Sequence, residues 1–201
     1  PSLRLSWTKE VFYTITKDNI HLVWKTSRVG EMHSFEEEIG YDPTIRQLGI
    51  NSPFEEFAIS YDLNRLGIPA VYVRAIYRTG SAKIEPSTDL RKYESHNNIL
   101  DPEGNPILQE NRNYITIRGY YNGPDRWVAE HSDALFTPLD LSKASYRGVI
   151  DESECAKLLD EMKERLRAVG YDGFLLKAND LLLAIDDKGE VMQNSTGRPE
   201  V

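Results

Sequence analysis

Residues 170–187, GYDGFLLKANDLLLAIDD, constrain the fold most, because they join a strongly helical segment to a run of leucines. In the preceding segment, residues 151–169, apolar side chains recur at spacings of three and four, which places them on one stripe of a helix. Asp151 can cap the start of this helix, and Gly170 is a typical residue just beyond a helix end. The sequence therefore predicts a core-facing helix over residues 151–169.

After this helix, the pattern changes to that of a loop followed by a β-hairpin. Residues 181–185 form an apolar run, and an acidic turn containing Gly189 separates them from a second short apolar run. This pattern is typical of two antiparallel strands joined by a tight turn. We expect the loop between the helix and the hairpin to carry Lys177, Asn179 and Asp180.

The first 30 residues predict antiparallel β structure. Residues 11–15 and 20–24 are rich in β-branched and aromatic side chains, and the turn-forming residues 16–19 separate them. Lys25 ends the second of these strands. A lysine at this place is either a solvated charge at a strand edge or a group that binds a ligand.

The best-defined helix of the first half is predicted over residues 52–66. Ser52 can cap its start, and Glu55 completes a capping box three residues later. Glu56 shares a line on the helix with apolar residues, so it is expected at the edge of the core. An unpaired charge there is costly, and Lys25 is the cation expected to pair with it. The alternative is that both glutamates only favour the positive end of the helix.

The remaining elements are two more strands and a long polar stretch between them. Residues 68–77 and 114–121 are β-rich, whereas residues 80–113 contain several turn signals and predict an insertion or long loop. The predicted fold class is α+β. An antiparallel sheet with a packed helix spans residues 1–122, and a helix and a hairpin follow within residues 123–201.

Composition excludes several classes of function. A formal net charge of −8 over 201 residues, without clustered Lys and Arg, argues against a nucleic-acid or anionic-membrane surface. Cys155 is the only cysteine, and no apolar stretch approaches the roughly 20 residues that span a bilayer. We therefore expect a cytoplasmic protein.

The sequence shows no pattern typical of a metal site. The four histidines share no metal-ligand spacing, and the consecutive acidic residues 36–38 point in different directions on a helix, so they cannot converge on one ion.

The loop at residues 176–183 resembles the catalytic loop of the protein-kinase-like fold, H-R-D-L-K-x-x-N-L-L-L. Leu176 and Lys177 align with its Leu-Lys, and Asp180 aligns with its metal-binding Asn. The strand that ends in Leu22-Val23-Trp24-Lys25 is similar to the V-A-I-K strand of this superfamily. There, the lysine pairs with a glutamate on the helix behind the strand, which is the place of Glu56 in this chain.

The resemblance implies a kinase-like N-lobe followed by the beginning of a C-lobe. It further implies that ATP, with Mg²⁺, would be bound by Lys25, Glu56, Lys177 and Asp180, and that Asp180 would hold the metal. Three departures accompany the matches. Leu175 stands at the position of the catalytic aspartate, the predicted turn between the first two strands has no glycine, and no D-F-G precedes Val201.

These observations predict a degenerate kinase-like domain that is not catalytically competent as given and that binds a nucleotide or another ligand between its lobes. One alternative is an interaction or scaffolding module with a protein partner and no small-molecule site. A second alternative is a fragment of an active ATP-dependent phosphotransferase completed beyond Val201. The residue at the start, Pro1 in place of an initiator Met, also favours a fragment or a processed chain.

Overall fold

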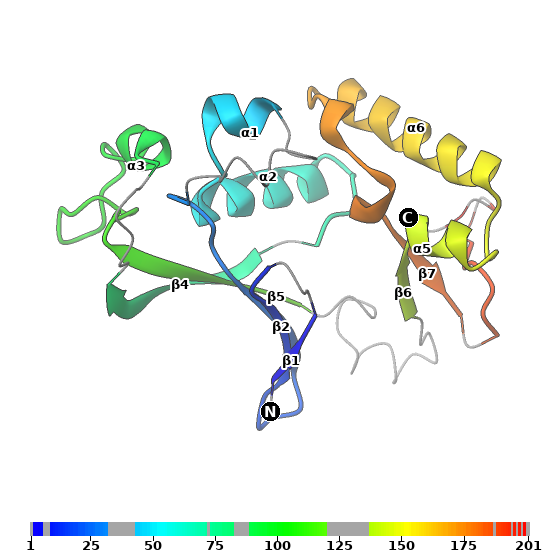
Figure 1. The fold of residues 1–201 in the computed structure, drawn as a ribbon, viewed down its shortest axis with the longest axis horizontal. Helices are drawn as coiled ribbons and strands as arrows, with labels where there is room; N and C mark the ends of the chain where they lie inside the picture. The colour runs from blue at the N-terminus through cyan, green and yellow to red at the C-terminus, as the bar shows by residue number, and fades with distance from the viewer. Residues whose placement is uncertain are drawn as a thin grey trace. The chain divides into compact units, whose positions relative to one another are not determined.

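The computed structural model describes residues 2–5, 9–31, 43–71, 73–82, 89–119, 137–186 and 188–193, together with 195, 197 and 199. It confirms a mixed α+β fold with an antiparallel sheet and several helices (Figure 1). Two compact units divide the chain. The first contains residues 1–14, 22–62 and 72–118, and the second contains residues 15–21, 63–71 and 119–201.

A sheet of five strands forms the centre of the first unit. Its spatial order is β1-β2-β3-β5-β4. β1 pairs antiparallel with β2, and β4 pairs antiparallel with β5, in a register that places Ile76 opposite Thr116. The strands are β1 (Ser2–Arg4), β2 (Val11–Ile15), β3 (His21–Thr26), β4 (Val73–Ala82) and β5 (Arg112–Gly119). The three N-terminal strands confirm the predicted β structure, whereas β4 begins and ends about five residues later than predicted.

Helix α2 (Pro53–Arg65) packs against this sheet, and a shorter helix, α1 (Pro43–Leu48), precedes it. The predicted capping box is present. The Glu55 N–H donates to Ser52 Oγ at 3.2 Å, and the Ser52 N–H donates to a Glu55 carboxylate oxygen at 2.7 Å. Phe54 on the first turn meets the Tyr114 ring of β5 edge to face, with 5.9 Å between ring centroids. These contacts fix which face of α2 meets the sheet.

The region predicted as an insertion or long loop is more structured than expected. Residues 80–82 are the end of β4, and α3 (Arg91–Ser95) follows after an interval outside the described residues. Tyr93 and Leu108 are only 4% and 1% exposed, and they form a core with Val29 and Tyr114. The Tyr114 hydroxyl donates to the Ile107 carbonyl at 3.1 Å and accepts from the Gln109 N–H at 2.7 Å. The segment 89–111 therefore contributes Tyr93 and Leu108 to the core of the first unit.

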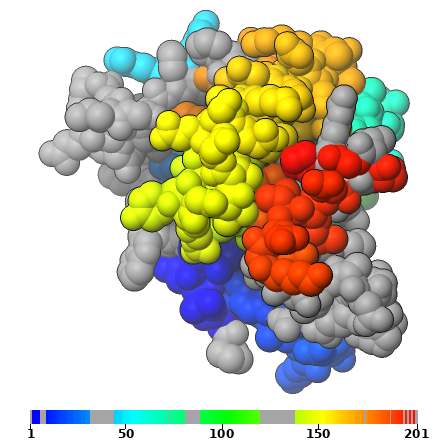
Figure 2. Space-filling view, turned by 90° about the vertical axis from the view of Figure 1, so that its right-hand side faces the viewer, coloured from blue at the N-terminus to red at the C-terminus, as the bar shows by residue number. Residues whose placement is uncertain are grey.

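Among its described residues, the second unit combines two helices with a two-stranded antiparallel sheet. Its helices are α5 (Leu141–Tyr146) and α6 (Glu152–Ala168), and its strands are β6 (Thr137–Asp140) and β7 (Leu182–Ile185). Short 3₁₀ turns at Gly173–Leu175 and Ala178–Asp180 join α6 to β7. Figure 2 shows α5 and the start of α6 (yellow) beside the residues that follow β7 (red) on one face. Leu141, Leu158, Met162 and Leu183 lie in the buried core of this unit.

The predicted hairpin after residue 181 needs a correction. The predicted turn forms, because the Asp186 N–H donates to the Glu190 carbonyl at 2.9 Å, but the return is only an isolated bridge between Ile185 and Val191. The strand that pairs with β7 along its length is β6, a segment in which the sequence predicts no strand. Pro138 lies in β6, and proline is tolerated there because β6 is an edge strand.

Helix α6 confirms the prediction at both ends. Asp151 is the N-cap, and its side chain accepts from the Glu154 N–H at 2.7 Å. Gly170 follows the helix with φ at +91°, a left-handed conformation that glycine adopts without steric cost.

Candidate functional site

Lys25 and Glu56 form an ion pair between β3 and α2. The Lys25 Nζ lies 2.6 Å from Glu56 Oε1, and the two side chains are 31% and 18% exposed. Lys25 is near the end of β3, and Glu56 is on the first turns of α2, after the helix start fixed by Ser52. The sequence predicts this pair, and the structure brings its two members together within the first unit.

The same carboxylate also binds Arg118, a residue that the sequence reasoning missed. Arg118 Nη2 lies 3.0 Å from Glu56 Oε2, and its side chain is 26% exposed. A signal for this contact exists in the sequence, because alternate residues of a strand share one face. Tyr114, which packs against α2, and Arg118 are four residues apart on β5, so both point towards the helix.

Burial and neighbouring charges both shift the ionisation of Lys25. Burial lowers the pKa of the Lys25 ammonium below its usual 10.5, and Arg118 and Lys9 lower this pKa further, whereas Glu56 raises it. One carboxylate therefore faces two cations in direct contact. The Lys25–Glu56–Arg118 cluster thus contains two cations and one carboxylate, and cationic N–H groups are the hydrogen-bond donors that suit phosphate oxygens.

Lys177 and Asp180 lie together on the 3₁₀ turn before β7, in the second unit. The Lys177 N–H donates to Asp180 Oδ2 at 3.0 Å, and the Asp180 N–H donates to the Lys177 carbonyl at 2.9 Å. Both residues are exposed, as is Asn179. These bonds give Asp180 a role in stabilising the turn and leave the Lys177 side chain at the surface.

The resemblance implies ATP and Mg²⁺ as ligands. The Lys25–Glu56–Arg118 cluster fits the phosphates of ATP better than the turn at Lys177 and Asp180 fits a metal ion. Two partly buried cations suit the charge and hydrogen-bonding needs of phosphate oxygens. For the metal, the described residues contain no group of three or more His, Cys, Asp or Glu side chains able to hold an ion. Within the described part of the chain, Asp180 belongs to no such group.

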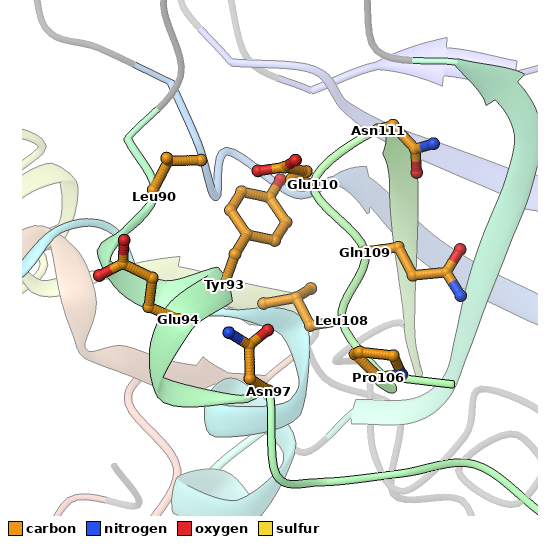
Figure 3. A pocket seen from close by; sticks show the side chains of 9 residues that line it. All are labelled: Leu90, Tyr93, Glu94, Asn97, Pro106, Leu108, Gln109, Glu110 and Asn111. Atoms are coloured by element: carbon orange, nitrogen blue, oxygen red, sulfur yellow. The ribbon is translucent and has the colours of Figure 1, made fainter. Parts of the chain in front are cut away.

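A concavity lies in the first unit between α3 and the segment before β5 (Figure 3). Its volume is about 440 Å³. Figure 3 shows its lining, which consists of Leu90, Tyr93, Glu94, Asn97, Pro106, Leu108, Gln109, Glu110 and Asn111. Burial, with smaller contributions from Tyr114 and Glu110, raises the pKa of the Tyr93 phenol to about 12. None of the predicted site residues lines this concavity.

A serine and a histidine also meet in the first unit, but their surroundings indicate a structural contact. Ser52 Oγ and His96 Nε2 lie 2.9 Å apart, and Ser95 Oγ lies 2.9 Å from His96 Nδ1. Ser52 is fully buried and already caps α2, and His96 is 5% exposed. The contact joins the start of α2 to the end of α3, where no substrate can approach the hydroxyl.

No family model, no curated protein and no solved structure matches this chain. Among the helices of the described residues, none combines the length and apolar character needed to cross a membrane.

Proposed function

We propose that this chain is a degenerate kinase-like domain that binds a nucleotide, or another ligand bearing phosphate groups, through Lys25. The observation that carries the proposal is the 2.6 Å ion pair between Lys25 on β3 and Glu56 on α2. In kinases, a strand lysine is held by a helix glutamate in this way, and the lysine binds nucleotide phosphates. Lys177 and Asp180 are proposed as further ligand contacts on the strength of the sequence resemblance.

Binding without phosphoryl transfer is the activity we propose for the chain as given. The catalytic aspartate of the resembling motif corresponds to Leu175, a side chain that has no proton-accepting group and is 37% exposed. The turn between β1 and β2 also lacks a glycine through which backbone N–H groups could closely approach a phosphate. Phosphate recognition would therefore depend on the charged side chains.

A thermal-shift series tests the proposal. ATP, ADP and GTP are added with and without magnesium or manganese, and a nucleotide at 100 times its Kd should stabilise the fold by about 2.7 kcal/mol. Lys25→Ala should remove this shift, while Lys17→Ala, on an exposed turn, should leave it unchanged. If no nucleotide raises the melting temperature of the wild-type chain, nucleotide binding is wrong.

A protein-interaction module is the second function that we consider, and exposed aromatic residues on α2 favour it. Phe57 and Tyr61 are 42% and 59% exposed, and their rings stack with 6.1 Å between centroids. Adjacent exposed aromatic side chains are enriched at protein interfaces. Under this alternative, no nucleotide raises the melting temperature, and Lys25→Ala changes only the stability of the fold.

A further inference from the structure

Another concavity of the first unit lies near the end of β4, beside the segment that leads into β5. Its volume is about 400 Å³, and small-molecule sites typically have volumes of roughly 300–1,000 Å³. It is lined by Arg78, Thr79, Gly80, Asn105, Gln109 and Arg112. The side chains in this set are polar, two of them are cationic guanidinium groups, and none of these described lining residues carries a carboxylate.

The register of the sheet brings the two arginines of this concavity together. Arg78 of β4 is directly opposite Tyr114 of β5, so these two side chains share one face of the sheet. Arg112 lies two residues before Tyr114 on β5 and shares the same face, because alternate residues of a strand point the same way. Arg78 and Arg112 are therefore diagonal neighbours, roughly 7–8 Å apart at their backbones, which is within reach of long side chains.

The electrostatics of Tyr114 agree with this placement. Burial raises the pKa of the Tyr114 phenol, whereas the hydrogen bond with the Gln109 backbone and the positive charges of Arg78 and Arg112 lower it. Both guanidinium groups thus act on the same phenol. The two cations are close to one another in space as well as in the register.

Local hydrogen bonds hold the neighbouring parts of the lining. The Arg112 N–H donates to the Gln109 carbonyl at 3.2 Å, a tight turn that keeps Gln109 beside Arg112 at the start of β5. Figure 3 shows that the Gln109 side chain points away from Tyr93. Arg112 Nη1 donates to the Gly80 carbonyl at 3.0 Å, which uses one of its five N–H donors. Among the described residues, neither Arg78 nor Arg112 forms an ion pair.

We propose that this concavity binds a small phosphate monoester, with Arg78 and Arg112 on the phosphate and the side-chain amides of Asn105 and Gln109 on hydroxyl groups of the ester. The planar guanidinium fork matches the oxygens of a phosphate. A phosphate monoester carries about 1.5–2 negative charges near pH 7, which suits two guanidinium groups. An amide both donates and accepts hydrogen bonds, as a hydroxyl group requires, so a sugar phosphate fits the lining. Lys25 does not line this concavity, and the inference does not depend on the proposed function.

Calorimetric titration of the folded chain with glucose 6-phosphate, inorganic phosphate and glucose tests the inference. We expect saturable binding of glucose 6-phosphate, weaker binding of inorganic phosphate, and no binding of glucose. Arg78→Gln and Arg112→Gln should each raise the Kd for glucose 6-phosphate at least about tenfold, because each removes cationic donors. Arg112→Gln also changes the contact with Gly80, so circular dichroism first establishes that it folds, and Arg78→Gln decides the test if it does not. Arg74→Gln is the matched control, because Arg74 is an exposed arginine of the same strand outside the lining.

The outcomes also separate this site from the one proposed at Lys25. Lys25→Ala should weaken ATP binding and leave the Kd for glucose 6-phosphate unchanged. The inference is overturned if the wild-type chain does not bind glucose 6-phosphate, if Arg78→Gln binds it with the wild-type Kd, or if Arg74→Gln weakens it equally, since net charge would then explain the effect. Tighter binding of a phosphoserine peptide than of glucose 6-phosphate would overturn the assignment to a small molecule.

Discussion

Lys25 and Glu56 are 31 residues apart in the sequence, yet the Lys25 Nζ lies 2.6 Å from Glu56 Oε1. The contact joins β3 to α2, and Arg118 extends it to β5 through the second oxygen of the same carboxylate. Glu56 therefore holds together three elements of the first unit.

Replacing Glu56 with Gln should destabilise the first unit. The change keeps the shape of the side chain but leaves Lys25 and Arg118 near each other without their common anion, a cost of about 1–3 kcal/mol. Urea unfolding followed by circular dichroism measures the loss. Glu103→Gln, at an exposed position, is the control and should change stability by less than about 0.5 kcal/mol. Equal stabilities of the two variants would contradict the role of Glu56.

Leu108→Ala tests whether residues 89–111 belong to the core. Leu108 is 1% exposed and packs with Tyr93 and Tyr114, so truncation should cost about 2–5 kcal/mol. Leu100→Ala is the matched control, because Leu100 lies in the same segment but is 55% exposed. A loose insertion would tolerate both substitutions equally, and that result in urea unfolding would reject the packing described above.

The Glu55–Lys92 ion pair predicts a pH dependence of stability. Burial opposes ionisation of Glu55, but hydrogen bonds from Lys92 Nζ, at 2.8 Å, and from the Ser52 N–H outweigh it and lower the Glu55 pKa below 4.5. Because the folded-state pKa is the lower one, the stabilisation is present above pH 4.5 and is lost as the pH falls through the folded-state value.

Glu55→Gln isolates this charge, because glutamine can still accept the capping hydrogen bond from Ser52. The difference in unfolding free energy between wild type and variant should be about 0.5–1 kcal/mol near neutral pH and should vanish in acid. Lys92→Met should show the same pH profile. A difference that stays constant from neutral to acidic pH would mean that the charge of Glu55 does not contribute.

Asp151→Ala should destabilise the second unit by about 1 kcal/mol, because the side chain of Asp151 caps α6. Ser153→Ala, in the exposed first turn of the same helix, is the control. Thermal unfolding of the two variants gives the comparison, and equal melting temperatures would show that the cap contributes nothing.

Local signals account for what the sequence predicts well. The starts of α2 and α6 follow from Ser52 and Asp151, whose caps depend only on residues within one turn. For the Lys25–Glu56 pair, the need for a cation follows from a general cost, since a carboxylate at the edge of a core requires one. The choice of Lys25, 31 residues away, follows the resemblance to the kinase-like fold.

Long-range contacts account for what the sequence does not predict. Tyr93 is buried because its hydroxyl reaches the Val29 carbonyl, 64 residues away, and because Leu108 packs beside it. Neither residue belongs to a periodic pattern, so the segment resembles a loop. Strand alternation places Arg118 on the same face of β5 as Tyr114, but that this face meets α2 is shown only by the packed structure.

Calorimetric titration of ATP into the wild-type chain and into Lys25→Ala tests the central claim most directly. Saturable binding by the wild type, weakened at least about tenfold in Lys25→Ala and retained in Lys17→Ala, is the result that we predict. No saturable binding by the wild-type chain, or the same Kd in Lys25→Ala, would contradict a phosphate site at Lys25.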